Sequence, residues 1–105
     1  DDMLIIKGVN VFPSQVETVL IEHGYSPNYQ LVVDRVNNSD TLDINVEMNP
    51  DMFSDNLGEI TAREKELVNA LKGFLGIYTR VHLVAPKSIP RSEGKAVRLI
   101  DKRKI

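Results

Sequence analysis

Two short segments of the sequence carry side chains that could do chemistry instead of filling a core. One is Lys7-Gly8-Val9-Asn10, close to the start, and the other is Pro90-Arg91-Ser92-Glu93-Gly94-Lys95. In the second segment a lysine follows a glycine in a stretch that prolines stiffen. An ammonium group there could approach a phosphate or a carboxylate closely, because glycine lets the backbone pass near a ligand. On spacing alone, a plain surface turn is the simpler interpretation.

The other chemically capable residues lack partners at a useful spacing. His23 lies on an apolar helical face and is expected to be a partly buried core residue, whereas His82 should be exposed on a strand. Two isolated histidines and no cysteines provide neither a zinc site nor a disulfide, so no metal site is predicted. Asp1 and Asp2 form a carboxylate pair, for which a charged chain end is the default interpretation. The sequence contains no glycine-rich phosphate loop.

The charge distribution favours an anionic partner near the C-terminal end. The formal net charge is −2, but residues 80–105 carry eight basic and two acidic side chains (+6), and residues 1–79 carry five and thirteen (−8). A solvated basic tail is the alternative interpretation. We expect no nucleic-acid partner, because Phe74 and Tyr78 are the only aromatic residues near this basic arm. No membrane partner is expected either, since no apolar run approaches the roughly 20 residues of a membrane span.

The length of 105 residues predicts a single domain, residues 1–105, with a modest core and no deep cavity. The opening Asp1-Asp2-Met3 has neither the basic and apolar character of a signal peptide nor an ordinary start residue. We therefore expect a cytoplasmic protein, and a fragment excised from a longer chain.

The first part of the chain predicts β structure and then a helix. Two β-prone runs within residues 3–12 flank Lys7-Gly8, so we expect a small hairpin or a bent strand, and Gly8 suits a tight turn. Ser14 and Glu17 then form a capping-box pattern, which predicts that the helix starts at Ser14. Gly24 is a natural C-terminal stop for this helix.

Periodicity predicts four further elements. Residues 29–36 are β-branched and apolar, and residues 41–48 alternate apolar and polar side chains, which is typical of a strand with one buried face. Because residues 37–40 have turn chemistry, the two strands should pair antiparallel. Apolar side chains at spacings of three and four predict a helix from about 56 to 75. A last strand is predicted at residues 79–85.

The predicted order is β-α-β-β-α-β, followed by a loop and a tail in which residues 96–104 are expected to form a short basic helix. This order indicates an α+β domain with a small antiparallel sheet covered by two helices. It leaves open a ferredoxin-like sandwich and other arrangements of the same elements.

Both reactive segments resemble motifs of one enzyme superfamily. The opening Asp1-Asp2-Met3-Leu4-Ile5-Ile6-Lys7-Gly8-Val9-Asn10-Val11-Phe12-Pro13-Ser14 resembles the hinge motif of adenylate-forming enzymes, in the form typical of phenylacetate–CoA ligases. The stretch from Leu83 to Arg98, centred on Pro90-Arg91-Ser92-Glu93-Gly94-Lys95, is similar to their last motif. The chain thus resembles, over nearly its whole length, the small C-terminal lid domain of an AMP-forming acyl-CoA ligase.

The resemblance implies a role for each matching residue. Lys95 would be the catalytic lysine of adenylation, supported by the loop residues Pro90, Arg91, Ser92, Glu93 and Gly94. Asp1, with Asp2 beside it, would be the hinge about which the domain swings. Lys7, Gly8, Val9 and Asn10 would line the CoA channel during thioester formation.

The resemblance also implies the substrates and a missing partner. The full-length enzyme would use ATP with Mg²⁺, coenzyme A and an aromatic carboxylic acid such as phenylacetate. The large N-terminal domain that holds ATP and the acid would be missing from this chain. We therefore expect no cofactor bound to this domain alone and no ligase activity from it.

Two other functions are compatible with the residues. A ferredoxin-like regulatory module would bind its ligand at a helix or dimer interface and would function without Lys95. A nucleic-acid adaptor would use the basic arm and show strongly salt-dependent affinity.

Overall fold

The computed structural model describes residues 3–51, 56–92, 95–96 and 99–103, and between residues 91 and 98 it gives only the backbone course of Arg91–Ser92 and Lys95–Ala96. The elements in chain order are β1 (Leu4–Ile6), β2 (Val9–Val11), α1 (Pro13–Glu22), β3 (Tyr29–Val36), β4 (Ser39–Glu47), α2 (Leu57–Leu75), β5 (Arg80–Val84), β6 (Arg91–Ser92), β7 (Lys95–Ala96) and β8 (Leu99–Asp101). The α+β class with two helices is therefore confirmed.

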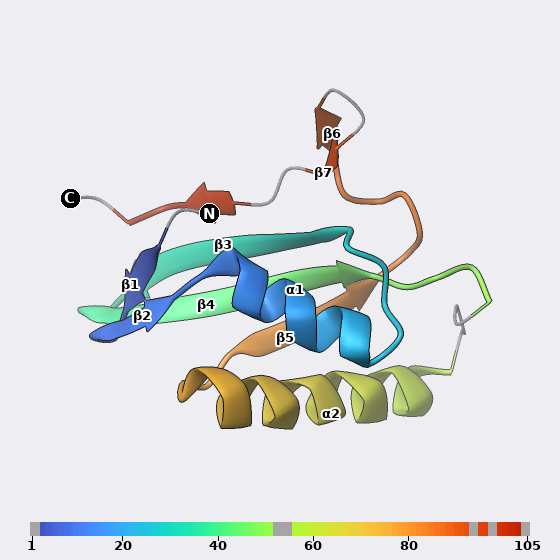
Figure 1. Cartoon of the computed structure of the whole chain (residues 1–105), viewed down its shortest axis with the longest axis horizontal. Helices are drawn as coiled ribbons and strands as arrows, with labels where there is room; N and C mark the ends of the chain where they lie inside the picture. Colours follow the sequence, from blue (N-terminus) through green and yellow to red (C-terminus); the bar gives the residue numbers. More distant parts are fainter. Residues whose placement is uncertain (1–2, 52–55, 93–94, 97–98, 104–105) are drawn as a thin grey trace.

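The main sheet has the strand order β5-β4-β3-β8 and is mixed (Figure 1). The expected antiparallel pairing of β3 with β4 is confirmed, and the turn between them places Asn37 and Asn38 at φ 52° and 65°. This pair of positive φ angles matches the right-handed twist of a two-residue hairpin. However, β4–β5 and β3–β8 pair parallel, so the expectation of an antiparallel sheet was only partly correct. The long crossover through α2 returns β5 in the direction of β4.

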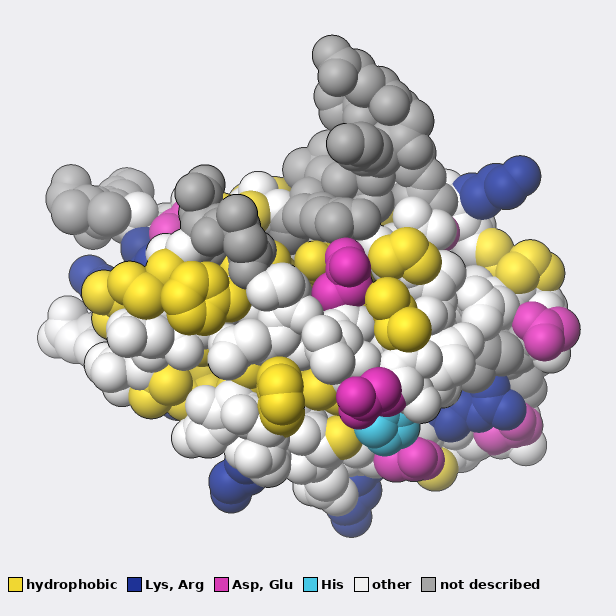
Figure 2. Space-filling view, in the orientation of Figure 1, with side chains coloured by type: hydrophobic (Ala, Val, Ile, Leu, Met, Phe, Trp, Pro, Cys, Tyr) yellow, Lys and Arg dark blue, Asp and Glu magenta, His cyan; other side chains and the backbone are white. Residues whose placement is uncertain are grey.

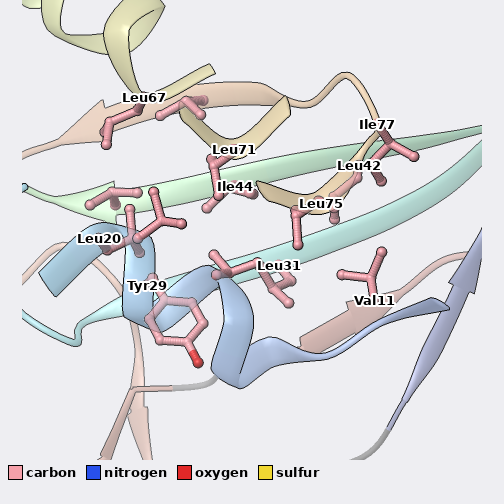
Figure 3. Packing of buried hydrophobic residues seen from close by; sticks show 14 of the residues in the cluster. Val11, Leu20, Tyr29, Leu31, Leu42, Ile44, Leu67, Leu71, Leu75 and Ile77 are labelled. Carbon is pink, nitrogen blue, oxygen red and sulfur yellow. The ribbon is translucent and has the colours of Figure 1, made fainter. Parts of the chain in front are cut away.

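The hydrophobic core lies between the helices and one face of this sheet. Figure 3 shows Leu20 of α1 and Leu67, Leu71 and Leu75 of α2 among side chains of β3 and β4. The two-residue period of β4 explains the contribution of that strand, because Leu42, Ile44 and Val46 are all buried on the same side. The predicted bounds of the second helix, about 56 to 75, are confirmed by α2.

The start of α1 differs from the prediction. The N-cap is Phe12, Pro13 occupies the first helical turn, and Ser14 lies inside the helix, where its carbonyl accepts a hydrogen bond from the Thr18 hydroxyl. The Gln15 side chain, not Glu17, accepts the N–H of Phe12 at 3.0 Å. Proline is favoured at this position because it has no N–H to leave unpaired and its φ already suits a helix.

The prediction of a short basic helix over residues 96–104 was wrong for the residues that the structure describes there. Leu99–Asp101 form strand β8, in register with Leu31, Val32 and Val33 of β3. The Lys102 N–H continues the ladder by donating to the Val33 carbonyl at 2.7 Å. The free edge of β3 offered unpaired backbone groups, and pairing with it outweighed the weak local helical pattern.

The first hairpin stays outside the main sheet. Within the described part of the chain, strands β1 and β2 pair only with each other, at the left end of the molecule in Figure 1. A ferredoxin-like sandwich would need its first strand within the sheet, so that arrangement is excluded. None of the helices in the described part of the chain is long and apolar enough to cross a bilayer.

Candidate functional site

The Lys7 loop, defined as Lys7-Gly8-Val9-Asn10, comprises the two-residue turn of the first hairpin and the first two residues of β2. Lys7 and Gly8 have φ angles of 53° and 76°, so both turn residues are in the left-handed region that a tight hairpin requires. Both side-chain positions are exposed, as is Asn10, whereas Val9 packs against the core. The loop therefore presents its polar residues outward from a fixed base, and the predicted hairpin around Gly8 is confirmed.

Asp40, at the start of β4, holds the Lys7 loop through the backbone. Its Oδ2 accepts the Lys7 N–H at 3.0 Å, and its Oδ1 accepts Nε of Arg35 at 3.0 Å. The pKa of Asp40 is lowered, first by the hydrogen bond from the Lys7 N–H and then by the one from Arg35. The carboxylate is therefore ionised at neutral pH, and it is only 12% exposed.

Arg103 joins the end of the chain to the same network. Its guanidinium donates to the Ile5 carbonyl at 2.7 Å and lies 3.3 Å from Oδ2 of Asp40. It also pairs with Asp101 at 2.9 Å, and this hydrogen-bonded pairing lowers the pKa of Asp101 and raises that of Arg103. Part of the basic arm thus neutralises acidic groups of the domain itself. Arg80 likewise pairs with Asp43 at 2.7 Å.

The Lys95 hairpin consists of β6 and β7, which pair antiparallel with Arg91 opposite Ala96 and Ser92 opposite Lys95. Lys95 is the first residue of β7, directly after the hairpin tip. Glu93 and Gly94, predicted as supporting loop residues, lie outside the described residues, as do the predicted hinge residues Asp1 and Asp2.

The root of the Lys95 hairpin is held by Glu47, at the end of β4. Its Oε1 accepts the Lys87 N–H and its Oε2 accepts the Ile89 N–H, each at 2.9 Å. Ser88, which lies between Lys87 and Ile89, closes a turn, because its N–H and its hydroxyl both donate hydrogen bonds to the Ala85 carbonyl. Lys87 has a φ of 63° in this turn, and Pro90, the next residue after the buried Ile89, is exposed. Both oxygens of one carboxylate thus fix the segment that leads into β6.

The two candidate segments lie apart. In Figure 1 the Lys7 loop is at the left end of the long axis, and the Lys95 hairpin stands off the top of the body, right of its centre. Figure 2 shows hydrophobic side chains gathered over the hairpin end that carries the Lys7 loop. An open hollow of about 450 Å³ beside this loop is lined by Lys7, Arg35, Asn38, Ser39 and Asp40. The domain therefore carries the two segments on separate surfaces.

The remaining sequence candidates have local structural roles. His23 is half-buried and its Nδ1 lies 2.9 Å from the Val19 carbonyl, whereas His82 is exposed as expected and its Nε2 lies 2.9 Å from Oδ2 of Asp43. Within the part of the chain that the structure describes, no cluster of three or more histidine, cysteine or acidic residues could hold a metal ion.

Sequence reasoning missed Asp40, Glu47 and Arg103. Alternation assigned Glu47 to the polar face of its strand, yet it is only 3% exposed because the segment around Ile89 covers it. A weak signal was available, because Glu47 lies at the end of the predicted strand, separated only by Met48 from the break at Asn49-Pro50.

The sequence of this domain matches a known protein family over most of its length. The sequence matches the family model of the AMP-binding enzyme C-terminal domain over residues 8–103, which includes the whole Lys95 hairpin and most of the Lys7 loop. The chain belongs to this family.

Curated members with similar C-terminal domains are phenylacetate–CoA ligases. That of Escherichia coli K12 is 43% identical over 106 residues and that of Aromatoleum evansii 42% over 109, and the matches cover 100% and 98% of this chain. They cover 24% of each relative, so the chain spans about a quarter of the length of these ligases.

Solved structures agree with this assignment. A domain of phenylacetate–CoA ligase from Bacteroides vulgatus superimposes with a TM-score of 0.88 at 34% identity, covering 99% of this chain and 95% of that domain. A 2-hydroxyisobutyryl-CoA ligase in complex with 2-HIB-AMP and CoA, in the thioesterification state, gives 0.86 at 32% identity over 99% of this chain and 22% of the ligase. The resemblance seen in the sequence is thereby confirmed, and the regulatory-module alternative is not favoured.

Proposed function

We propose that this chain is the mobile C-terminal domain of an ATP-dependent, AMP-forming CoA ligase for an aromatic acid of the phenylacetate type. The observation that carries the proposal is the match of the whole domain, fold and sequence, to the corresponding quarter of phenylacetate–CoA ligases. The two separate loops of the domain suit an enzyme that performs two different half-reactions. Both ATP and CoA are abundant in the cytoplasm, where we place the enzyme.

Lys95 serves the first half-reaction, adenylation. A carboxylate oxygen of the acid attacks the α-phosphorus of ATP, and pyrophosphate leaves with the electrons of the broken P–O bond. Both reactants are negatively charged, so an ammonium group beside them stabilises the charge that develops in the transition state. The position of Lys95 directly after a hairpin tip supports this role, because a short antiparallel hairpin can reach into a neighbouring domain. The family resemblance assigns Pro90, Arg91, Ser92, Glu93 and Gly94 as the loop residues that support this lysine.

The Lys7 loop serves the second half-reaction, thioester formation. The sulfur of CoA attacks the acyl carbon of the adenylate, AMP leaves, and the thiol proton passes to solvent. This step needs a narrow path for the pantetheine chain of CoA. The loop suits it because Gly8 carries no side chain, and a Cβ built at this position meets no atom within 4 Å among the described residues. Asp1 and Asp2 act as the hinge that lets the two loops take turns.

Mg²⁺ enters with ATP, whose phosphates it neutralises, and the N-terminal domain supplies the pockets for ATP and the acid. This division of labour agrees with the size of the chain relative to its ligase relatives. It also explains why we expect the isolated domain to have no ligase activity.

A chimera tests the proposal. This chain replaces the matching segment of the E. coli phenylacetate–CoA ligase, and Lys95→Ala is introduced into it. We expect adenylation, measured as pyrophosphate release from ATP and phenylacetate without CoA, to fall about 10²- to 10³-fold, the usual effect of losing one preorganised charge-stabilising group. Conversion of preformed phenylacetyl-AMP to phenylacetyl-CoA should stay within a few-fold.

The matched control is Lys65→Ala, which removes an exposed lysine of α2 far along the chain from either loop. It should leave both half-reactions unchanged. A folded chimera without any ligase activity would refute the proposed function. Equal losses of both half-reactions in Lys95→Ala would refute the assignment of this lysine to adenylation.

A further inference from the structure

We propose that strand β4 positions both functional loops, with Asp40 at one end fixing the Lys7 loop for thioester formation and Glu47 at the other end fixing the Lys95 hairpin for adenylation. Neither carboxylate touches a substrate in this scheme, so both are positioning residues. The inference rests on the proposed function, which assigns one half-reaction to each loop.

The contact of Asp40 holds the Lys7 loop through the loop backbone. The carboxylate binds the N–H of Lys7, the first turn residue, across 33 positions of sequence. Arg103 reinforces the contact, since one guanidinium nitrogen reaches both the Ile5 carbonyl of β1 and Asp40. The two side chains are 10% and 12% exposed. These contacts thus fix the position of the Lys7 turn relative to the main sheet.

The contact of Glu47 has the same form at the other loop. Its two oxygens bind two backbone N–H groups, those of Lys87 and Ile89, 40 and 42 positions away. Ile89 is 4% exposed and is followed by Pro90, after which β6 begins at Arg91. The hairpin that carries Lys95 therefore leaves the body from a point that Glu47 and the buried Ile89 side chain define together.

The spacing of the two carboxylates along β4 directs them to different loops. They lie seven positions apart, which corresponds to about 23 Å of extended strand at roughly 3.3 Å per residue. Because the interval is odd and side chains alternate between faces, they also point to opposite faces of the sheet. Asp40 shares the side of the buried Leu42 and Ile44, and Glu47 shares that of Asp43. One rigid central strand thus sets the separation of the two loops.

The consequence is that each carboxylate should affect one half-reaction. A misplacement of about 1 Å in a reacting group can slow a step on the order of 100-fold. Loosening one loop leaves the other attached to its own end of the strand. A carboxylate that merely stabilised the fold would instead lower both half-reactions together.

The test uses the chimera with three substitutions on β4. Asp40→Asn should slow conversion of preformed phenylacetyl-AMP to phenylacetyl-CoA by about 10- to 100-fold, with adenylation within about twofold. Glu47→Gln, which keeps the shape of the side chain, should produce the reverse. The control is Asp43→Asn on the same strand. Among the described residues the Asp43 carboxylate pairs with Arg80 and His82, so its loss should change neither rate.

A second measurement needs no ligase activity. In the 105-residue chain, amide hydrogen exchange at Lys7 should accelerate in Asp40→Asn only, and exchange at Ile89 in Glu47→Gln only. Should Glu47→Gln fail to fold, the Asp40→Asn arm decides the question. An inactive but folded parent chimera would refute the proposed function. An active parent whose Asp40→Asn variant slows both half-reactions equally, or neither, would refute only the inference about β4.

Discussion

Replacing Glu47 with alanine should destabilise the isolated domain far more than replacing Asp43, although both are carboxylates on the same face of β4. Glu47 is 3% exposed and accepts two backbone N–H groups, whereas the Asp43 side chain is 24% exposed and pairs with Arg80 and His82 at the surface. The two residues differ in burial and in the kind of group they bind. They therefore form a matched pair for measuring what the buried carboxylate contributes.

The magnitude follows from the hydrogen bonds. A hydrogen bond to a charged group contributes about 1.5–3 kcal/mol, so the two from Lys87 and Ile89 sum to roughly 3–6 kcal/mol. Removing the carboxylate also removes the free-energy cost of burying a charge, which offsets part of this loss. We therefore expect a net loss of about 3 kcal/mol for Glu47→Ala. The surface pairs of Asp43 should contribute about 0–1 kcal/mol.

Urea unfolding of the 105-residue chain, followed by circular dichroism, measures both values. A domain of this size has roughly 5–15 kcal/mol of stability, so both variants should still fold. In thermal unfolding, a loss of 1 kcal/mol lowers Tm by about 4–8 °C in small domains. Glu47→Ala should therefore lower Tm by about 12–24 °C, and Asp43→Ala by less than about 8 °C.

Equal losses for the two variants would refute the reasoning, because they would mean that burial and the two backbone contacts add nothing to the carboxylate's effect. A large loss for Glu47→Ala without faster amide exchange at Ile89 would also contradict it. In that case the stabilisation would arise somewhere other than the segment leading to the Lys95 hairpin.

Two further predictions concern other sites. Thr79→Val should raise the free energy of unfolding by about 1 kcal/mol in the same urea assay. The Thr79 hydroxyl is buried with no hydrogen-bond partner among the described residues, and valine has the same shape without the polar group. An unchanged or lower free energy of unfolding would contradict this. For Asp40, the lowered pKa means that the ionised form is favoured by folding, so its stabilisation is present above about pH 4 and is lost as the pH falls below that value. The difference in unfolding free energy between the parent chain and Asp40→Asn should therefore shrink from pH 7 to pH 3, and a constant difference would contradict the prediction.

The sequence by itself determined most of the local structure, because local structure depends on neighbours along the chain. The alternation in residues 41–48 predicted β4, the spacing of apolar side chains predicted α2, and Lys7-Gly8 predicted the first hairpin. Motif resemblance at both ends of the chain identified the family. The start of α1 was placed wrongly because the local signal at Ser14 competed with the equally local preference of Pro13 for a first helical turn.

Only the tertiary structure decided how distant segments meet. The residues of β8 had only a weak local pattern, which favoured a helix, and the free edge of β3 selected the strand. The contacts of Asp40 with Lys7 and Arg103, and of Glu47 with Lys87 and Ile89, join residues 33 to 63 positions apart. Such pairings depend on the order of strands in the sheet, which periodicity along the chain does not encode. The burial of Glu47 likewise depends on the distant segment around Ile89 that covers it. The alternation along β4 alone assigned Glu47 to the polar face, but in the folded domain this residue is buried.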